Sequence, residues 1–148
     1  MTESNFTIGF IGLGLIGGSI AKGIRRVFPN YTLIGMDENP DTIKSALEEG
    51  IIDSVATDCK TDFADCNYVF LCAPVQYNVM YLKDLKESIN KDCILTDVGS
   101  VKEEIHLKIE ELGMEECFIG GHPMVGSEKA GFSFSSDRLV ENAYYFIT

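Results

Sequence analysis

The chain has 148 residues, of which 45% are hydrophobic and 24% charged, a composition typical of one globular domain and not of a disordered chain. Twelve Lys and Arg against 23 Asp and Glu give a net charge of −11, which disfavours nucleic acid and anionic membrane surfaces as partners. No apolar run approaches the ~20 residues of a membrane span, and the first residues lack the pattern of a secretory signal.

Short apolar runs alternate with segments of helical periodicity along the chain. The runs predicted to be strands are residues 6–11, 31–36, 68–73, 93–96, 117–119 and 144–147. The apolar residues at helical spacing between them are Ile20, Ile24 and Val27, then Ile43, Leu47 and Ile51, then Val79, Leu82, Leu85 and Ile89, then Val101, Ile105, Ile109 and Leu112. Asn39 before Pro40 is typical of a helix start, and Gly50 and Gly113 suit helix C-terminal ends.

This alternation predicts an α/β fold of the Rossmann type, a doubly wound and mainly parallel sheet with helices on both faces. We expect residues 1–148 to form one dinucleotide-binding domain. In such sheets ligands bind beyond the carboxyl ends of the strands, near the point where the strand order reverses. Functional residues are therefore expected directly after strands.

The five cysteines do not form a CxxC pair and have no histidines at metal-ligand spacing. Three of them lie in apolar strand-like runs, which favours buried free thiols over disulfides or metal ligands. We therefore predict no metal site and a reducing, cytoplasmic location.

The glycine motif GLGLIG, residues 12–17, follows the first predicted strand and opens the first helix. In a dinucleotide-binding loop Gly12 would make the tight turn, Gly14 would admit the pyrophosphate, and Gly17 would pack the helix on the strand. The pyrophosphate would lie on the helix N-terminus, at Leu15 and Ile16, where unpaired N–H groups favour anions. Glycines that merely form a turn are the alternative.

Asp37 ends the second predicted strand, 20 residues after Gly17. An acid at this place accepts hydrogen bonds from the adenosine ribose and repels a 2′-phosphate, which favours NAD over NADP. The alternative is a solvated turn residue beside Glu38 and Asn39.

The turn Cys72-Ala73-Pro74-Val75 follows the strand predicted at residues 68–73. Its backbone is expected to line the groove between the adenosine and nicotinamide ends of the cofactor, with Pro74 shaping the turn. A simple strand-end turn is compatible with this role.

Two later stretches, TDVGSVK at residues 96–102 and GGHPMVGSEKAG at residues 120–131, narrow the choice of enzyme. With the glycine loop they resemble prephenate dehydrogenase, an enzyme of tyrosine biosynthesis, or its relative arogenate dehydrogenase. The resemblance implies NAD-dependent oxidative decarboxylation of prephenate, a small molecule, to 4-hydroxyphenylpyruvate. It also implies that His122 takes the proton of the ring hydroxyl and that Ser100 lies beside it and the nicotinamide.

Each of these two residues also has a structural interpretation. His122 is able to act as a general base near neutral pH, although a loop histidine bonded to backbone is the alternative. Ser100 is equally suited to cap the helix that begins near VKEE, and the two roles are compatible. His106 is predicted to lie on a surface, and Glu128 and Lys129 receive no role.

The resemblance implies a helical domain that follows the strand at residues 144–147, forms a homodimer and closes over the substrate. These 148 residues do not contain it, and they include only three arginines, Arg25, Arg26 and Arg138, to bind a dicarboxylate. We therefore expect this chain to be the cofactor-binding half of a longer enzyme, and to be inactive as an isolated domain.

Three other functions share parts of this pattern. A different hydroxy-acid dehydrogenase would use the same cofactor domain, and a methyltransferase also pairs a glycine loop with an acid after the second strand. An NAD-sensing regulatory module would bind the cofactor without chemistry. His122 and Ser100 after adjacent strands disfavour the sensor, which needs no base.

Overall fold

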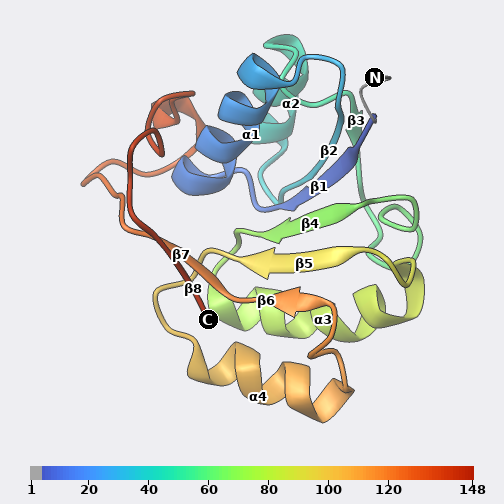
Figure 1. The fold of residues 1–148 in the computed structure, drawn as a ribbon. Helices are drawn as coiled ribbons and strands as arrows, with labels where there is room; N and C mark the ends of the chain where they lie inside the picture. Colours follow the sequence, from blue (N-terminus) through green and yellow to red (C-terminus); the bar gives the residue numbers. More distant parts are fainter. Residues whose placement is uncertain (1–4) are drawn as a thin grey trace.

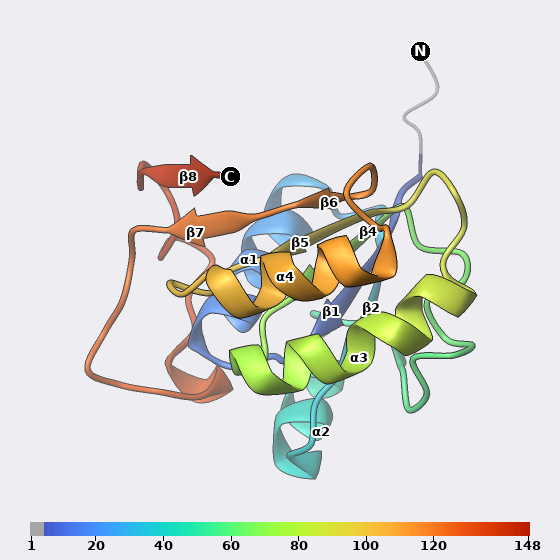
Figure 2. The same ribbon diagram turned by 90° about the horizontal axis from the view of Figure 1, so that it is seen from below.

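The computed structural model of this chain describes residues 5–148 and shows a central sheet covered by helices on both faces (Figures 1 and 2). The strands are β1 (Thr7–Ile11), β2 (Thr32–Met36), β3 (Ser54–Val55), β4 (Tyr68–Leu71), β5 (Ile94–Asp97), β6 (Phe118–Ile119), β7 (Gly121–Pro123) and β8 (Tyr145–Ile147). The helices are α1 (Leu15–Val27), α2 (Pro40–Glu48), α3 (Val75–Ser88), α4 (Glu103–Leu112) and the 3-10 turn η1 (Phe132–Phe134). None of the helices in the described part of the chain is long and apolar enough to cross a bilayer.

The central sheet is parallel throughout and has the strand order β3-β2-β1-β4-β5-β6. The chain builds outward from β1 to β3, then crosses back and builds outward again from β4 to β6. The strand order therefore reverses between β1 and β4, which is where doubly wound sheets bind ligands. The predicted Rossmann-type fold is confirmed.

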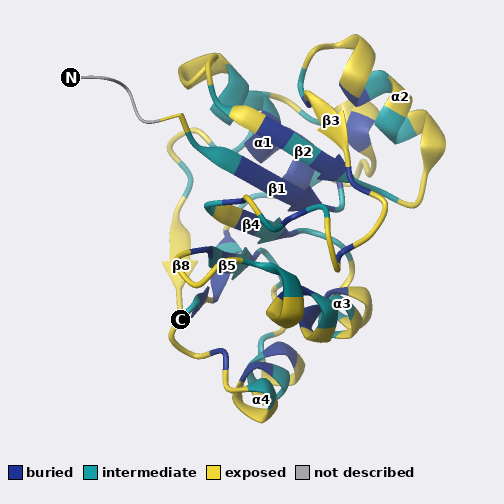
Figure 3. Ribbon diagram, turned by 90° about the vertical axis from the view of Figure 1, so that its right-hand side faces the viewer, coloured by how far each residue is buried: buried dark blue, intermediate teal, exposed yellow. Residues whose placement is uncertain are grey.

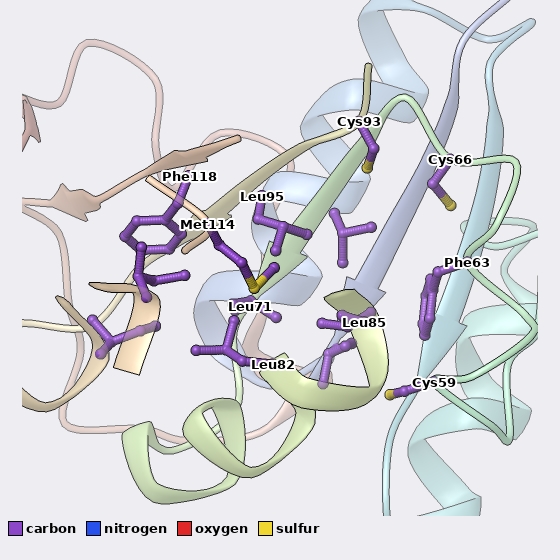
Figure 4. Close-up of a cluster of buried hydrophobic side chains, with 14 of the residues drawn as sticks. Cys59, Phe63, Cys66, Leu71, Leu82, Leu85, Cys93, Leu95, Met114 and Phe118 are labelled. Carbon is purple, nitrogen blue, oxygen red and sulfur yellow. The ribbon is translucent and has the colours of Figure 1, made fainter. Parts of the chain in front are cut away.

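Two hydrophobic cores lie on the two faces of the sheet, and the alternation of β1 separates them. Phe10 faces the core under α1 and α2, whereas Ile11 faces the core under α3 and α4. The second core contains Leu82 and Leu85 of α3, which lie close to Leu71 and Leu95 of the sheet (Figure 4). Both faces of the sheet are thus covered by apolar side chains, which explains the near-continuous apolar strands in the sequence.

The ends of α2 and α4 follow the signals in the sequence. The Asn39 side chain accepts a hydrogen bond of 3.0 Å from the Asp41 N–H and caps α2. Gly50 and Gly113 have φ values of +67° and +64° just past the two helices, a conformation that favours glycine.

Several residues of the predicted helical patterns are exposed or lie outside the helices, and one of them is Leu47 of α2, which is 41% exposed. Val27 is the last residue of α1 and is 57% exposed, because the helix ends as it leaves the sheet. Ile51 lies beyond α2, and Val101 precedes α4 and is 59% exposed. The apolar spacing predicted that α2 ends later, and that α4 begins earlier, than the structure shows.

The strand predicted at residues 144–147 exists but does not join the central sheet. It is β8, which pairs antiparallel with β7 in a separate two-stranded sheet. Figure 3 shows β8 as exposed, in contrast to the buried β1. The apolar pattern predicted the strand but not its partner, because strand pairing depends on which distant segments of the chain meet.

The segment after β7 packs back onto α1, a contact that no pattern in the sequence indicates (Figure 1). Phe132 of η1 is 3% exposed and belongs to the core under α1, and the Lys22 ammonium lies 4.3 Å from its ring centroid. The buried Ser19 hydroxyl accepts a 3.0 Å hydrogen bond from the Ser136 N–H. This segment therefore packs against the helix that follows the glycine loop.

Candidate functional site

The glycine loop between β1 and α1 is shaped by close backbone packing. Gly12 has a φ of +92°, and a Cβ built there would lie 2.6 Å from the Ala73 nitrogen. A Cβ on Gly17 would overlap the Gly12 carbonyl oxygen and would lie 2.9 Å from the Cys72 Cβ. The first and third glycines thus have structural reasons within the chain itself.

Gly14 has no such reason. Its φ of −71° is open to any residue, and a Cβ built on it meets nothing within 4 Å. The space beside Gly14 is therefore available to a molecule from outside the chain. This is the arrangement that a bound pyrophosphate requires, because it approaches the backbone at this point.

The N-terminus of α1 adds an electrostatic attraction for an anion. Gly14 is the N-cap residue, no side chain caps the helix, and its first turn contains no acidic residue. The N–H groups of Leu15, Ile16 and Gly17 precede the first intrahelical bond, from the Gly18 N–H to the Gly14 carbonyl oxygen at 2.9 Å. These groups and the helix dipole favour a phosphate.

Asp37 is anchored to the glycine loop and is not a free turn residue. Its Oδ2 accepts a hydrogen bond of 2.8 Å from the Leu13 N–H, and its Oδ1 accepts one of 2.9 Å from the Asn39 N–H. A carboxylate has about four lone-pair positions, so two remain for the hydroxyl groups of a ligand. Asp37 thus has both a structural task and spare acceptor capacity.

A cleft of about 170 Å³ lies at the carboxyl ends of β1, β2 and β4. It brings together six of the residues predicted to bind a cofactor: Gly12, Gly14, Asp37, Cys72, Ala73 and Pro74. Five other residues were predicted to bind the cofactor and do not line the cleft. Leu15, Ile16, Gly17 and Val75 begin α1 and α3 beside it, and Ser100 lies in the loop after β5. The residues present fit a dinucleotide, since they supply an open glycine, a helix N-terminus and a carboxylate.

Ser100 and His122 lie in the adjoining part of the fold, outside this cleft. Ser100 is exposed in the loop between β5 and α4, where Lys102 occupies the N-cap position and no side chain caps the helix. The capping role predicted for Ser100 is therefore wrong, because α4 begins later than its apolar pattern suggests. His122 is half-buried in the centre of β7, and its buried Nδ1 has no hydrogen-bond partner among residues 5–148.

A buried ion pair joins the segments that carry these two residues. Asp97 ends β5 and is 1% exposed, and both of its carboxylate oxygens lie 2.7 Å from the Lys102 Nζ. Asp97 also accepts hydrogen bonds from the Gly99 N–H at 3.0 Å and the Gly121 N–H at 3.2 Å. Lys102 donates a further hydrogen bond to the Gly121 carbonyl oxygen.

Comparison with known proteins gives the family of this chain. The sequence model described as "Prephenate dehydrogenase, nucleotide-binding domain" matches residues 20–148. The chain belongs to this family. It is 36% identical to the prephenate dehydrogenase of Bacillus subtilis over 150 aligned positions, which cover all of this chain and 40% of that protein.

Two solved structures resemble this chain closely. A crystal structure of prephenate dehydrogenase from A. aeolicus, in complex with hydroxyphenyl propionate and NAD+, superposes with a TM-score of 0.88 at 34% identity, covering 100% of this chain and 52% of that one. The Synechocystis arogenate dehydrogenase has a TM-score of 0.86 at 34% identity, covering 96% and 49% respectively. This chain thus spans about half the length of the two solved chains and 40% of the length of the Bacillus subtilis protein.

Several residues of the site were not predicted from the sequence. Tyr77 and Tyr81 line the cleft from α3, and their spacing of four residues after the Pro74 turn was an available signal. Glu38 also lines it, although it was noted only as a neighbour of Asp37. Asp97 follows a buried strand as Asp37 does, but its pairing with Lys102 has no signature in sequence spacing.

Other residues that received no functional role lie outside the cleft. Glu128 and Lys129 are exposed, and the Lys129 ammonium lies 5.0 Å from the Phe134 ring centroid. His106 was expected on the surface but is half-buried, with its Nε2 3.1 Å from the Thr148 hydroxyl and its ring edge-on to Phe118. Burial, and next the Asp97 charge, raises the pKa of the Cys72 thiol far above its ordinary value, so Cys72 lines the cleft as a neutral group.

Proposed function

We propose that this chain is the nucleotide-binding part of an NAD-dependent dehydrogenase that converts prephenate to 4-hydroxyphenylpyruvate in tyrosine biosynthesis. The observation that carries the proposal is the empty space at Gly14 beside an uncapped helix and the anchored carboxylate of Asp37. Membership of the family supports it, as does the solved relative in complex with hydroxyphenyl propionate and NAD+.

The cofactor would lie across the carboxyl ends of β1, β2 and β4. The N–H groups of Leu15 and Ile16 would bind its pyrophosphate, and Asp37 would accept hydrogen bonds from the adenosine ribose. The negative charge of Asp37 would repel a 2′-phosphate and so select NAD over NADP. When bound, the nicotinamide supplies a hydride acceptor.

His122 would act as the general base of the reaction. The C–H bond at the hydroxyl-bearing ring carbon breaks as hydride leaves, and an imidazole nitrogen of His122 takes the hydroxyl proton. The bond to the ring carboxylate then breaks, carbon dioxide leaves, and the electron pair completes the aromatic ring of the product. The Nδ1 of His122 is buried and has no hydrogen-bond partner among the described residues, so the other ring nitrogen is the one that would meet the substrate.

Ser100 would orient the substrate hydroxyl or the imidazole. It is exposed, it does not cap α4, and it lies in a loop that follows a central strand. A hydroxyl group both donates and accepts, so it is able to bridge an imidazole and a substrate. We further propose that the enzyme is a cytoplasmic homodimer. The five free thiols support a reducing compartment, and the dimer rests on the family resemblance alone.

Titration calorimetry of the chain with NAD+, NADP+ and S-adenosylmethionine tests the cofactor. We expect NAD+ to bind most tightly of the three. Preferential binding of S-adenosylmethionine would replace the proposal with a methyltransferase, and NAD+ binding without turnover of any substrate by the complete enzyme would favour a sensor.

Arogenate dehydrogenase is the second candidate function. The arogenate dehydrogenase and the prephenate dehydrogenase of known structure are both 34% identical to this chain, so overall similarity does not separate the two substrates. NADH formation with prephenate and with arogenate, measured on the complete enzyme, decides between them.

A further inference from the structure

In the small β7–β8 sheet, the main chain of Gly121 makes its hydrogen bonds on the side that faces away from β8. Gly120 and Thr148 exchange two hydrogen bonds, from the Gly120 N–H at 3.1 Å and from the Thr148 N–H at 2.9 Å. In an antiparallel pair the next position is not hydrogen-bonded, and here that position is Gly121 opposite Ile147. The N–H and C=O of Gly121 therefore point away from β8.

Asp97 and Lys102 bind both of these main-chain groups. The Asp97 Oδ1 accepts the Gly121 N–H at 3.2 Å, and the Lys102 ammonium donates to the Gly121 carbonyl oxygen. Two side chains of opposite charge thus occupy the place that a neighbouring strand would take. An apolar pair would leave both buried groups of Gly121 without partners.

The same pair fixes the loop that contains Ser100. The Gly99 N–H donates to the Asp97 Oδ2 at 3.0 Å, and the Lys102 Nζ lies 2.7 Å from both oxygens of Asp97. Ser100 therefore lies between two residues that are bound to one buried carboxylate. His122 directly follows Gly121, which is bound to the same carboxylate.

Buried ion pairs of this kind contribute little net stability, and their attested use is to select one arrangement over others. We propose that Asp97 and Lys102 are a positioning pair that holds the Ser100 loop and the His122 strand in one fixed relation for catalysis. The inference rests on the proposed function, in which Ser100 and His122 act on the substrate. Neither Asp97 nor Lys102 lines the cofactor cleft, so the pair acts through its neighbours.

The test compares Lys102→Met with Lys108→Met in the full 148-residue chain. Lys108 is a matched control, because it lies on α4, the helix that follows Lys102, and pairs with Glu111 at 2.8 Å without touching Asp97. NMR spectroscopy would measure the amide exchange rate of Gly121 and the imidazole signals of His122. We expect Lys102→Met to raise the Gly121 exchange rate at least ~10-fold and to shift the His122 signals, and Lys108→Met to change neither.

Two further measurements separate positioning from general damage to the fold. The NAD+ affinity of Lys102→Met should stay within about twofold of wild type, while kcat of the complete enzyme should fall by ~10²-fold. Lys102→Arg, which keeps the cation, should recover part of kcat. Unchanged His122 signals and Gly121 exchange in Lys102→Met would overturn the proposal, and so would an equal loss of NAD+ affinity and kcat.

A second variant covers the case in which Lys102→Met does not fold, since it leaves a buried carboxylate unpaired. Asp97→Asn/Lys102→Met leaves no charge in the site, and it should show the same altered Gly121 exchange in a folded chain. If that double variant keeps wild-type exchange and His122 signals, the proposal is wrong. A wild-type enzyme that forms no NADH from prephenate would overturn the proposed function instead, and the NMR comparison would still decide whether the pair fixes β7.

Discussion

Asp37 shows how one side chain serves both the fold and a ligand. Its carboxylate accepts hydrogen bonds from the Leu13 and Asn39 N–H groups, and it also lines the cleft. A substitution at this position therefore has two consequences, and they are separable by experiment.

Asp37→Ser should lower the free energy of unfolding by about 1–3 kcal/mol, because two hydrogen bonds to a charged group are lost. It should also narrow the preference for NAD+ over NADP+ by ~10-fold, since the charge that repels a 2′-phosphate is gone. Urea unfolding measures the first effect, and calorimetry with both cofactors measures the second. Equal binding of the two cofactors by the wild-type chain would contradict the role given to Asp37.

His122→Asn should reduce kcat of the complete enzyme by ~10²–10⁴-fold, the usual contribution of a positioned base. NAD+ affinity should stay within about twofold of wild type, because His122 does not line the cofactor cleft. Steady-state kinetics with prephenate checks both values. A rise confined to KM would make His122 a binding residue and not a base.

At the scale of elements, the sequence predicts those features that depend on residues close together in the chain. The Asn39 cap and the left-handed glycines after α2 and α4 depend on contacts within a few residues. The sequence did not reveal β3, whose two residues pair only with β2, or the packing of Phe132 on α1. These features depend on where distant segments meet, and no spacing rule encodes that.

The same distinction explains what was missed in the site. Asp37 was found because it stands at a fixed distance from a recognisable loop. The Asp97 interactions combine a contact five residues away with contacts to Gly121 on a different element. In the sequence Lys102 is a charged residue before a predicted helix, and nothing there marks it as the partner of Asp97.

Asn39→Ala tests the local account of α2. The variant loses the side-chain acceptor for the Asp41 N–H and should lower the free energy of unfolding by about 0.5–2 kcal/mol. NAD+ affinity should not change, because Asn39 does not line the cofactor cleft. Thermal or urea unfolding measures the loss, and an unchanged stability would show that water replaces the cap without cost.

At the scale of the whole molecule, buried thiols link stability to pH. Burial raises the pKa of Cys59 and Cys66 to about 12 and that of Cys93 to about 11, from an ordinary value of 9.0. Above pH 9 the unfolded chain releases these protons while the folded chain keeps them. The folded state then binds more protons, so the free energy of unfolding must fall as pH rises from about 9 to about 11.

Urea unfolding between pH 8 and pH 10.5 measures this decline. Each buried thiol contributes a slope of up to about 1.4 kcal/mol per pH unit in this window. Cys66→Ala removes one such group and should make the decline shallower than in wild type. A decline of the same slope in the variant would show that other groups cause it.

The central claim is that a dinucleotide occupies the space beside Gly14, and one calorimetric comparison tests it most directly. Gly14→Ala adds a methyl group where the chain has nothing within 4 Å, so the free energy of unfolding should change by less than about 1 kcal/mol. Gly17→Ala is the contrasting variant, because its methyl group would overlap the Gly12 carbonyl oxygen and destabilise the fold. We expect titration of NAD+ into the stable Gly14→Ala chain to show an affinity at least ~10-fold below that of wild type. Wild-type affinity in that variant would contradict the placement of the cofactor.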